Sequence, residues 1–272
     1  MDKREGHKKD LICLLEEYFE TGHDQDLIGY IVSNSNLPGP RGNLELAQAF
    51  GDLAQDCTAD NVEGLWRLSA QMAGVSAEEA PVNAPAELVP FCGALSMGAI
   101  GSISTTFYGP ALSALRELAS DSRWRMREAV RFGLQRLLAR RWDTTLHAFD
   151  SWVEPGAWLE MRAAATAVAE PLLLEDPENA RAGLTLHRRI IDQLVRANHR
   201  RNDAFKAFRK GLAYSLSVVV AALPNEGFPY LAQLADSRDS DMLWVLKQNL
   251  KKSRLVKHFP QEVEAIWRRL PA

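Results

Sequence analysis

Apolar residues recur every three or four positions along most of this chain, which is the spacing of one buried helix face. The clearest stripe consists of Met126, Val130, Leu134, Leu137 and Leu138. A second stripe, which ends at the stop signal Pro224-Asn-Glu-Gly227, consists of Phe208, Leu212, Leu216, Val219, Val220 and Leu223. The sequence has no convincing alternating run bounded by hairpin turns. The pattern therefore predicts an all-α fold with buried side chains at Met126, Val130, Leu134, Val219 and Leu246.

Helix-start signals precede several stripes, at Asn43, Asp121-Ser122, Glu154-Pro155, Asp176-Pro177 and Ser237-Arg-Asp239. Two segments rich in Pro, Gly and small residues interrupt the stripes, at 33–43 and 73–87. We expect the first segment to form a turn that ends in a helix cap. The second is expected to be a surface connection, and it is the best candidate boundary of an acidic N-terminal subregion, 1–85.

One pattern occurs four times: a large apolar or aromatic residue is followed by a basic residue, a small residue and an apolar stripe. The basic positions are Arg127, Arg162, Arg209 and Lys247, here called the basic ladder, and they are separated by 35, 47 and 38 residues. Helix pairs of the HEAT and armadillo type recur at about 40–47 residues. The spacing predicts a right-handed α-solenoid, with one domain over 1–272 and HEAT-like repeats over 86–272. The function of such a fold depends on its concave surface.

Charge is distributed unevenly along the chain, although the formal net charge is only −3. Residues 1–120 contain 7 Lys and Arg against 17 Asp and Glu, whereas residues 121–272 contain 25 against 18. Such asymmetry is typical of a basic half that binds nucleic acid or another anion. A dipolar surface that keeps the protein soluble, or an acidic half that packs against the basic half, explains the same numbers. Both interpretations stay open at this point.

Cysteine use and hydropathy bear on the cellular compartment. Cys13, Cys57 and Cys92 are far apart and form no Cys-x-x-Cys, which argues against a disulfide framework and against a zinc site. No apolar run approaches the roughly 18 residues of a membrane span. The charged N-terminal segment is unlike a secretory signal. We therefore expect a cytoplasmic protein without a metal or a membrane contact.

Motifs of known enzyme chemistry are missing from the sequence. It contains no Gly-x-Gly-x-x-Gly, no phosphate-binding loop, no His-Glu-x-x-His and no Gly-x-Ser-x-Gly, so no cofactor is expected. The small-residue segment 96–104 favours a close approach of two helices, or a kink, over a phosphate site. Arg41, inside the Pro/Gly turn, is either part of a plain turn or the side chain of an anion site.

Histidines and tryptophans offer two further interpretations. His187 and His199, each followed by two arginines, would lie about 18 Å apart on one helix and could not share a metal. With Arg196 they predict a cationic helix segment that is solvated or contacts phosphate. Trp124, Trp158 and Trp244 lie at or near the first repeat position, where packing between repeats is expected. Stacking on a nucleobase is the alternative.

Three segments of the second half resemble one known family. They are Arg141-Trp142-Asp143-Thr144, Trp158-Leu-Glu-Met-Arg162-Ala-Ala164 and Pro260-Gln-Glu-Val263-Glu-Ala-Ile-Trp267. These are similar to Trp-Asp-Thr-Val-Asp, Trp-Leu-Gln-Arg-Ala-Ala and the Pro-x-x-Val-x-x-x-Trp ending of the bacterial alkylpurine DNA glycosylases built from HEAT-like repeats. The resemblance covers residues 120–270 and needs an insertion near 180–200. HEAT-like repeats share such patterns without sharing an activity.

The resemblance implies a basic cleft that grips the DNA backbone. Trp142 matches the family's first cleft tryptophan, and Arg162 matches its backbone-gripping arginine. The family's carboxylate position is Leu146 here, and its second cleft tryptophan falls near Asn249. A chain without that carboxylate lacks the group that stabilises a departing cationic sugar, unless Asp143 or Asp150 substitutes for it. The resemblance therefore supports the fold and a groove better than it supports base excision.

Three functions stay open: a non-catalytic scaffold for a protein or peptide, a duplex-DNA-binding protein without excision activity, and an active glycosylase with a relocated acid. We expect a monomer in each case. The candidate partner-binding residues are Arg127, Trp142, Arg162, Lys206, Arg209, Lys247 and Lys251. If Arg127, Arg162, Arg209 and Lys247 line one groove, nucleic acid is favoured. If their charges are capped by carboxylates, the scaffold is favoured, and the expected caps are Glu128, Glu160 and Asp203.

Overall fold

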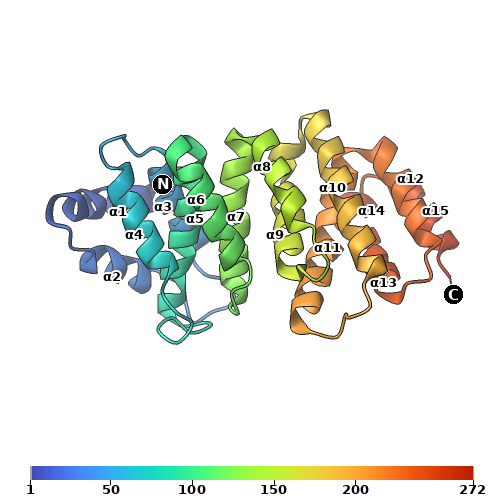
Figure 1. The fold of residues 1–272 in the computed structure, drawn as a ribbon, viewed down its shortest axis with the longest axis horizontal. Coiled ribbons are helices and arrows are strands. Elements are labelled where there is room, and N and C mark those ends of the chain that lie inside the picture. Colours follow the sequence, from blue (N-terminus) through green and yellow to red (C-terminus); the bar gives the residue numbers. More distant parts are fainter. Residues whose placement is uncertain (1, 272) are drawn as a thin grey trace. The chain divides into compact units, whose positions relative to one another are not determined.

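A computed structural model describes residues 2–271, in which the chain forms two compact units, Met1–Arg141 and Trp142–Ala272. Every regular element among the described residues is a helix, as Figure 1 shows. The all-α class is thus confirmed, and the five side chains expected in the core are fully buried. The segment 73–87 connects two helices inside the first unit. The right-handed superhelix and the single-domain organisation stay predictions.

The first unit is built around one central helix. Its helices are α1 (Lys3–Thr21), α2 (Gln25–Ser33), α3 (Leu44–Gln55), α4 (Val62–Ala73), η1 (Pro85–Glu87), α5 (Leu88–Ile103), α6 (Thr105–Leu118) and α7 (Trp124–Arg140). Helix α5 has no charged side chain, and it packs against α3, α4, α6 and α7. Every residue of α5 from Leu88 to Ser102 is buried. A helix that is apolar on all sides belongs at the centre of a core, and α5 occupies that position.

Small residues allow α5 to approach its neighbours closely. A Cβ atom at Gly98 would lie 2.3 Å from the Cα atom of Gly133 in α7, and one at Gly93 would lie 2.4 Å from the backbone nitrogen of Ala73 in α4. Both distances are far inside van der Waals contact. The segment 96–104 therefore serves the close helix approach that the sequence predicted.

The same helix corrects one expectation from the sequence. The stretch Pro85–Ile103 has a mean hydropathy of 1.4 over its window and is long enough to cross a membrane. However, 89% of that window is buried inside the protein. The scattered Gly and Ser residues hid the length of this apolar run. In this fold the stretch forms the core of a helical unit.

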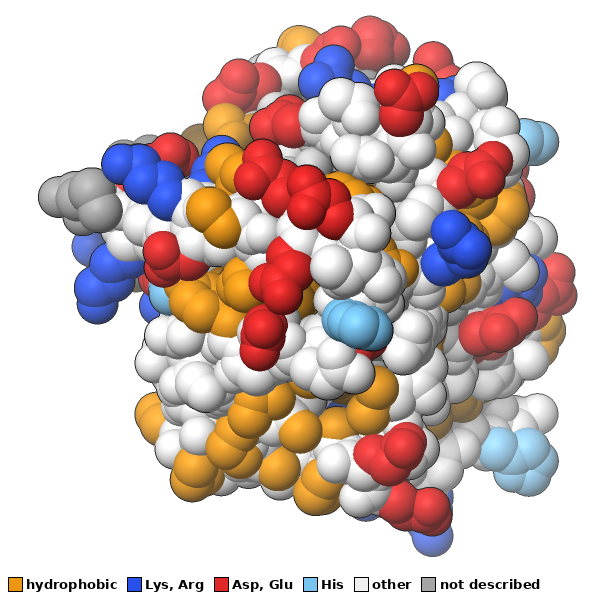
Figure 2. Space-filling model, turned by 90° about the vertical axis from the view of Figure 1, so that its left-hand side faces the viewer, with side chains coloured by type: hydrophobic (Ala, Val, Ile, Leu, Met, Phe, Trp, Pro, Cys, Tyr) orange, Lys and Arg blue, Asp and Glu red, His pale blue; other side chains and the backbone are white. Residues whose placement is uncertain are grey.

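The acidic surplus of the first unit lies on its surface. In α1, for example, Glu16, Glu17 and Glu20 are all exposed. Figure 2 looks onto the end of the unit that carries α1 and α2, and acidic side chains are spread across this face whereas basic ones are few.

The second unit consists of two rows of helices. Its helices are α8 (Trp142–Ala148), η2 (Phe149–Trp152), α9 (Trp158–Val168), η3 (Pro171–Leu174), α10 (Pro177–Arg196), α11 (Asp203–Ala222), α12 (Pro224–Ala235), α13 (Ser240–Leu250), α14 (Ser253–Val256) and α15 (Pro260–Arg269). In one row α9 packs against α11 and α11 packs against α13, while α10, α12 and α15 cover the other side. Stacked helix pairs of this kind are typical of helical-repeat proteins.

Helix caps agree with the sequence at three of five places. Asn43, Asp176 and Asp239 each accept a hydrogen bond from a backbone N–H in the first turn of a helix. Helix α9 begins at Trp158 and not directly after Glu154-Pro155, because the chain turns at Gly156 with a φ of 87°. At the fifth place Asp121 accepts from the backbone N–H of Arg123, and α7 starts one residue later.

Candidate binding surface

The row formed by α9, α11 and α13 exposes a set of basic and aromatic side chains. On α11 the apolar residues Phe205, Phe208, Leu212 and Leu216 point inward. The 3.6-residue period therefore places Lys206, Lys210 and Tyr214 outward, and all three are exposed. We define the basic–aromatic face as Arg162, Lys206, Arg209, Lys210, Tyr214, Trp244, Lys247, Lys251, Lys252 and Arg254.

Arg209 is the best-anchored cation of this face. Its Nη1 donates to the Asp241 carboxylate, and its guanidinium lies 4.2 Å from the centre of the Trp244 ring. Its Nε is buried and has no hydrogen-bond partner among the described residues. The cation–π contact and the ion pair fix Arg209 and Trp244 against each other. Arg209 therefore joins α11 to α13 and also presents charge on the surface.

The lysines of the face differ in how their charges are balanced. The ammonium group of Lys206 lies 2.9 Å from the Asp203 carboxylate, which was expected to cap a residue of the basic ladder instead. Lys210, Lys247 and Lys251 have no carboxylate within ion-pair distance in the described part of the chain. The face therefore combines neutralised cations with cations that remain available to an anionic partner.

Tyr214 is a part of this face that the sequence analysis did not single out. Tyr214 is 41% exposed. The guanidinium of Arg254 lies 4.6 Å and the ammonium of Lys252 lies 6.0 Å from its ring centre. The signal was present as the four-residue spacing of Lys206, Lys210 and Tyr214, which places them on one helix face.

The other candidate residues lie in different surroundings. Arg162, in α9, packs its side chain along α11, so that a Cβ atom at Gly211 would lie 2.9 Å from the Cγ atom of Arg162. Trp142 is half-buried at the start of α8. Arg127 belongs to the first unit, and its Nη1 donates to the backbone carbonyls of Asp121 and Ser122 at 2.7 and 3.1 Å. Of the basic ladder, Arg162, Arg209 and Lys247 therefore lie on the packed row of α9, α11 and α13.

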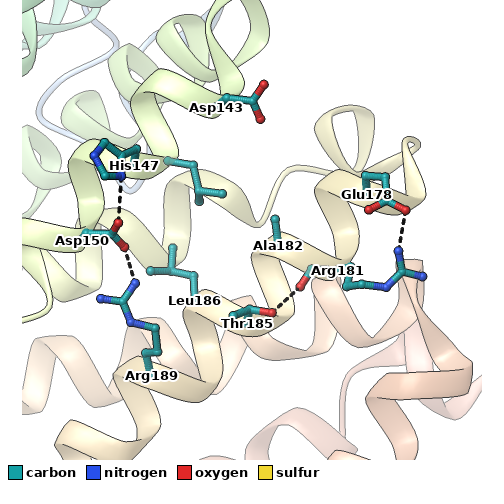
Figure 3. A pocket seen from close by; sticks show the side chains of 10 residues that line it. Asp143, His147, Asp150, Glu178, Arg181, Ala182, Thr185, Leu186 and Arg189 are labelled. Carbon is teal, nitrogen blue, oxygen red and sulfur yellow. Dashed lines mark hydrogen bonds and ion pairs between the residues drawn. The ribbon is translucent and has the colours of Figure 1, made fainter.

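Leu146 lines a separate pocket of about 470 Å³. Residues of α8, η2 and α10 line it, as Figure 3 shows, and Leu186 and Ala182 provide apolar surface between two charged groups. On one side Asp150 accepts hydrogen bonds from His147 and from Arg189. On the other side Arg181 pairs with Glu178 at 2.6 Å. Leu146 thus occupies apolar surface where the family resemblance would place an acid.

The Asp150 carboxyl group of this pocket is not suited to act as a general acid. The hydrogen bond from Arg189 outweighs partial burial and, together with His147, lowers the pKa of Asp150 below its ordinary value. A carboxyl group that is more acidic than usual stays ionised near neutral pH and has no proton to donate. Asp150 therefore acts as an ion-pair partner between η2 and α10.

Two expectations about histidine and tryptophan are wrong. His187 is fully buried, where its Nδ1 donates to the Gly183 carbonyl and its Nε2 accepts from the Ser215 hydroxyl, so it forms no cationic patch. His199 lies beyond the end of α10. Trp124 is 45% exposed, whereas Trp158 packs against Phe205 and Phe208 as expected.

Asn249, the residue near the expected second cleft tryptophan, is also buried. Its amide donates to the carbonyls of Leu212 and Val245 and accepts from the Ser217 backbone N–H. It therefore holds α11 and α13 together and lines no cleft. Within residues 2–271 no group of three His, Cys, Asp or Glu side chains is placed to hold a metal ion.

Comparisons with known proteins add little to this geometry. No protein-family model and no curated protein matches the chain. Among solved structures the chain is similar to a designed armadillo repeat protein, with 14% sequence identity over 82% of this chain and 98% of that chain. The TM-score of 0.29 is too low for this likeness to carry an argument. The fold class therefore rests on the helices themselves.

Proposed function

We propose that this protein is a non-catalytic helical-repeat scaffold that binds an acidic segment of a partner protein through the basic–aromatic face. The observation that carries the proposal is the arrangement around Arg209, which pairs with Asp241 and stacks on Trp244. Aromatic and arginine side chains are the residues that most often anchor protein interfaces. Lys210, Lys247 and Lys251 supply the uncompensated charge that attracts carboxylates.

Paired cations distinguish this proposal from phosphate binding. Lys206 and Arg209 already have carboxylate partners, so a phosphate would compete with Asp203 and Asp241 for them. A partner protein offers hydrogen-bond donors as well as carboxylates, and it can keep both ion pairs intact. The mixture of paired and unpaired charges therefore supports a protein partner.

A binding titration with two polyanions tests the proposal. The probes are a labelled glutamate-rich peptide and a labelled duplex DNA of equal net charge, and an arginine-rich peptide is the control for charge sign. We expect the glutamate-rich peptide to bind more tightly than the duplex at about 150 mM salt. Equal affinity for both acidic probes, or no binding to either, would contradict the proposal.

Duplex DNA is the second candidate partner because of Tyr214. An exposed ring with two cations beside it can pack against a sugar while the cations contact phosphates, and the family resemblance implies a DNA groove. If DNA is the partner, Arg162→Ala and Arg209→Ala should weaken binding to all sequences alike. Each variant should also lower the slope of log K against log salt by about one unit, since a phosphate contact releases counterions.

Base excision is expected to be absent whatever the affinity for DNA. A carboxylate aimed at the sugar stabilises the positive charge of glycosidic cleavage by several kcal/mol, and Leu146 supplies none. We expect no release of 7-methylguanine or 3-methyladenine from alkylated duplex DNA. Release that disappears in Asp143→Asn or Asp150→Asn would show a relocated acid and would establish the glycosylase.

A further inference from the structure

A second, smaller pocket lies in the first unit, where the turn before α3 meets α5 and α7. Its volume is about 180 Å³, and its apolar lining comes from Leu44, Leu88, Phe91, Trp124 and Phe132. The rings of Phe91 and Phe132 lie 6.2 Å apart, centre to centre. Trp124 lines the pocket and is 45% exposed. Contiguous apolar surface of this kind, with an exposed indole as part of it, is typical of a binding groove.

The walls of this pocket are held in place by buried polar contacts. The guanidinium of Arg125 lies 4.4 Å from the Trp124 ring centre, and it donates to the Glu87 carboxylate at 2.8 Å and to the Gly39 carbonyl at 2.7 Å. Glu87 also accepts from the backbone N–H of Asn83 at 2.7 Å. A pocket whose walls are fixed before binding loses little conformational entropy when a ligand enters.

The size of the pocket indicates what it can hold. Sites for free small molecules usually measure about 300–1,000 Å³, so 180 Å³ is small for a metabolite. Pockets at the centre of protein interfaces take one large aromatic or aliphatic side chain, and surrounding contacts exclude water. The volume is therefore suited to a single apolar side chain of a partner chain.

The charges around the pocket indicate what surrounds that side chain. Three arginines and one glutamate line it, Arg41, Arg125, Arg131 and Glu128. Arg131 stacks on Phe132 at 4.0 Å and pairs with Glu128 at 3.2 Å, while the largely exposed Arg41 pairs with Glu45 at 3.3 Å. Elsewhere residues 1–120 are rich in carboxylates. The Arg41–Glu45 pair is exposed to solvent and therefore weak, so the Arg41 guanidinium is the cation of this rim that an acidic residue of a partner can reach.

We propose that this pocket is a separate docking site that takes a phenylalanine-sized side chain from an acidic segment of a partner protein. The aromatic side chain lies against Phe91, Trp124 and Phe132, and flanking carboxylates approach Arg41 and Arg131. This site does not depend on the basic–aromatic face of the second unit, because all of its residues belong to the first unit.

Saturation-transfer NMR with unlabelled peptides on the full chain tests the proposal. The probes are two short peptides with acidic residues on both sides of a central Phe or a central Ala. We expect the Phe ring protons to receive the strongest transfer and the Phe peptide to bind about tenfold more tightly. Trp124→Ala should abolish this difference between the peptides, whatever acidic binding the second unit retains. Arg131→Glu should weaken binding of the Phe peptide several-fold.

Matched control variants distinguish an effect on the pocket from a general effect of surface substitution and from loss of folding. Val82→Ala removes another exposed apolar side chain of the same unit, and Arg67→Glu reverses another exposed arginine, so both should leave the peptide affinities unchanged. Melting curves followed by circular dichroism verify that each variant folds. Equal affinity of the Phe and Ala peptides for the wild-type protein would overturn the proposal. Binding of free indole as tightly as the Phe peptide would assign the pocket to small molecules and would also overturn it.

Discussion

The two units use their positive charges differently. In the first unit Arg125 and Glu87 form an ion pair whose side chains are 6% and 0% exposed, and the Asp52 carboxylate binds Arg4 and Arg136 from two other helices. In the second unit the Arg209 side chain is 28% exposed and that of Lys206 is 64% exposed. Arg125 and Arg136 of the first unit therefore join helices, whereas Lys206 and Lys210 of the second unit are exposed to a partner. The net charge of a segment does not tell these two uses apart.

The largest expected effect comes from breaking the buried pair of the first unit. Glu87→Ala leaves Arg125 as an uncompensated buried charge, and such losses cost about 3–5 kcal/mol of the free energy of unfolding. Denaturant unfolding followed by circular dichroism measures the change. The matched control is Glu264→Ala, which removes one partner of the exposed pair with Arg268 and should leave the midpoint unchanged. An equal change in the unfolding midpoint for both variants would contradict the distinction between a buried, structural ion pair and an exposed one.

As the pH is lowered, the second unit should lose stability at a higher pH than the first unit does. Burial lowers the pKa of His187 to about 4, and the hydrogen bond with Gly183 offsets this only in part. Below pH 6.5 the unfolded chain binds a proton that folded His187 does not accept until about pH 4. Stability of the second unit should therefore fall as pH drops through this window, by about 3 kcal/mol in total. Denaturant unfolding at a series of pH values measures this slope.

In the first unit, Asp52 should make the free energy of unfolding depend on pH, but at lower pH than His187 does in the second unit. Burial by itself would raise its pKa, but hydrogen bonds from Arg4, Arg136 and Lys8 outweigh burial and lower the pKa to about 2. Its stabilising effect is therefore complete above about pH 3.8 and is lost as pH falls towards 2. His187→Gln should remove the slope between pH 6.5 and 4 and leave the Asp52 region unchanged. Persistence of the upper slope in that variant would assign it to another group.

A smaller effect is expected at the helix contact inside the first unit. Gly98→Ala places a methyl group 2.3 Å from the Gly133 backbone, and overpacking of this kind costs about 1–3 kcal/mol. Gly29→Ala in α2 is the control, because no atom lies within 4 Å of the new methyl group and alanine favours the helix. Thermal melts of the two variants should shift in opposite directions. A melt of Gly98→Ala that matches the wild type would show that α5 and α7 can move apart freely.

Local periodicity was sufficient to predict the helices but not the surroundings of individual polar side chains. The Met126–Leu138 and Phe208–Leu223 stripes identified buried faces, and Asn43, Asp176 and Asp239 identified helix starts, because these signals act within a few residues. His187 depends on a contact with the distant Ser215, and Arg125, which stacks on the neighbouring Trp124, is held by the distant Glu87. No spacing rule records such long-range contacts, which is why one residue was expected outside and the other inside.

Paired charge reversal tests the central distinction between the units most directly. Lys210→Glu with Lys247→Glu reverses two unpaired cations of the basic–aromatic face, and Lys9→Glu with Arg67→Glu reverses two exposed cations of the first unit. The measurement is the Kd of the glutamate-rich peptide, with the Tm of each variant determined alongside. We predict that the second-unit pair weakens binding by at least about tenfold without lowering the Tm, whereas the first-unit pair changes neither. Equal loss of affinity in both variants, or none in either, would contradict the account.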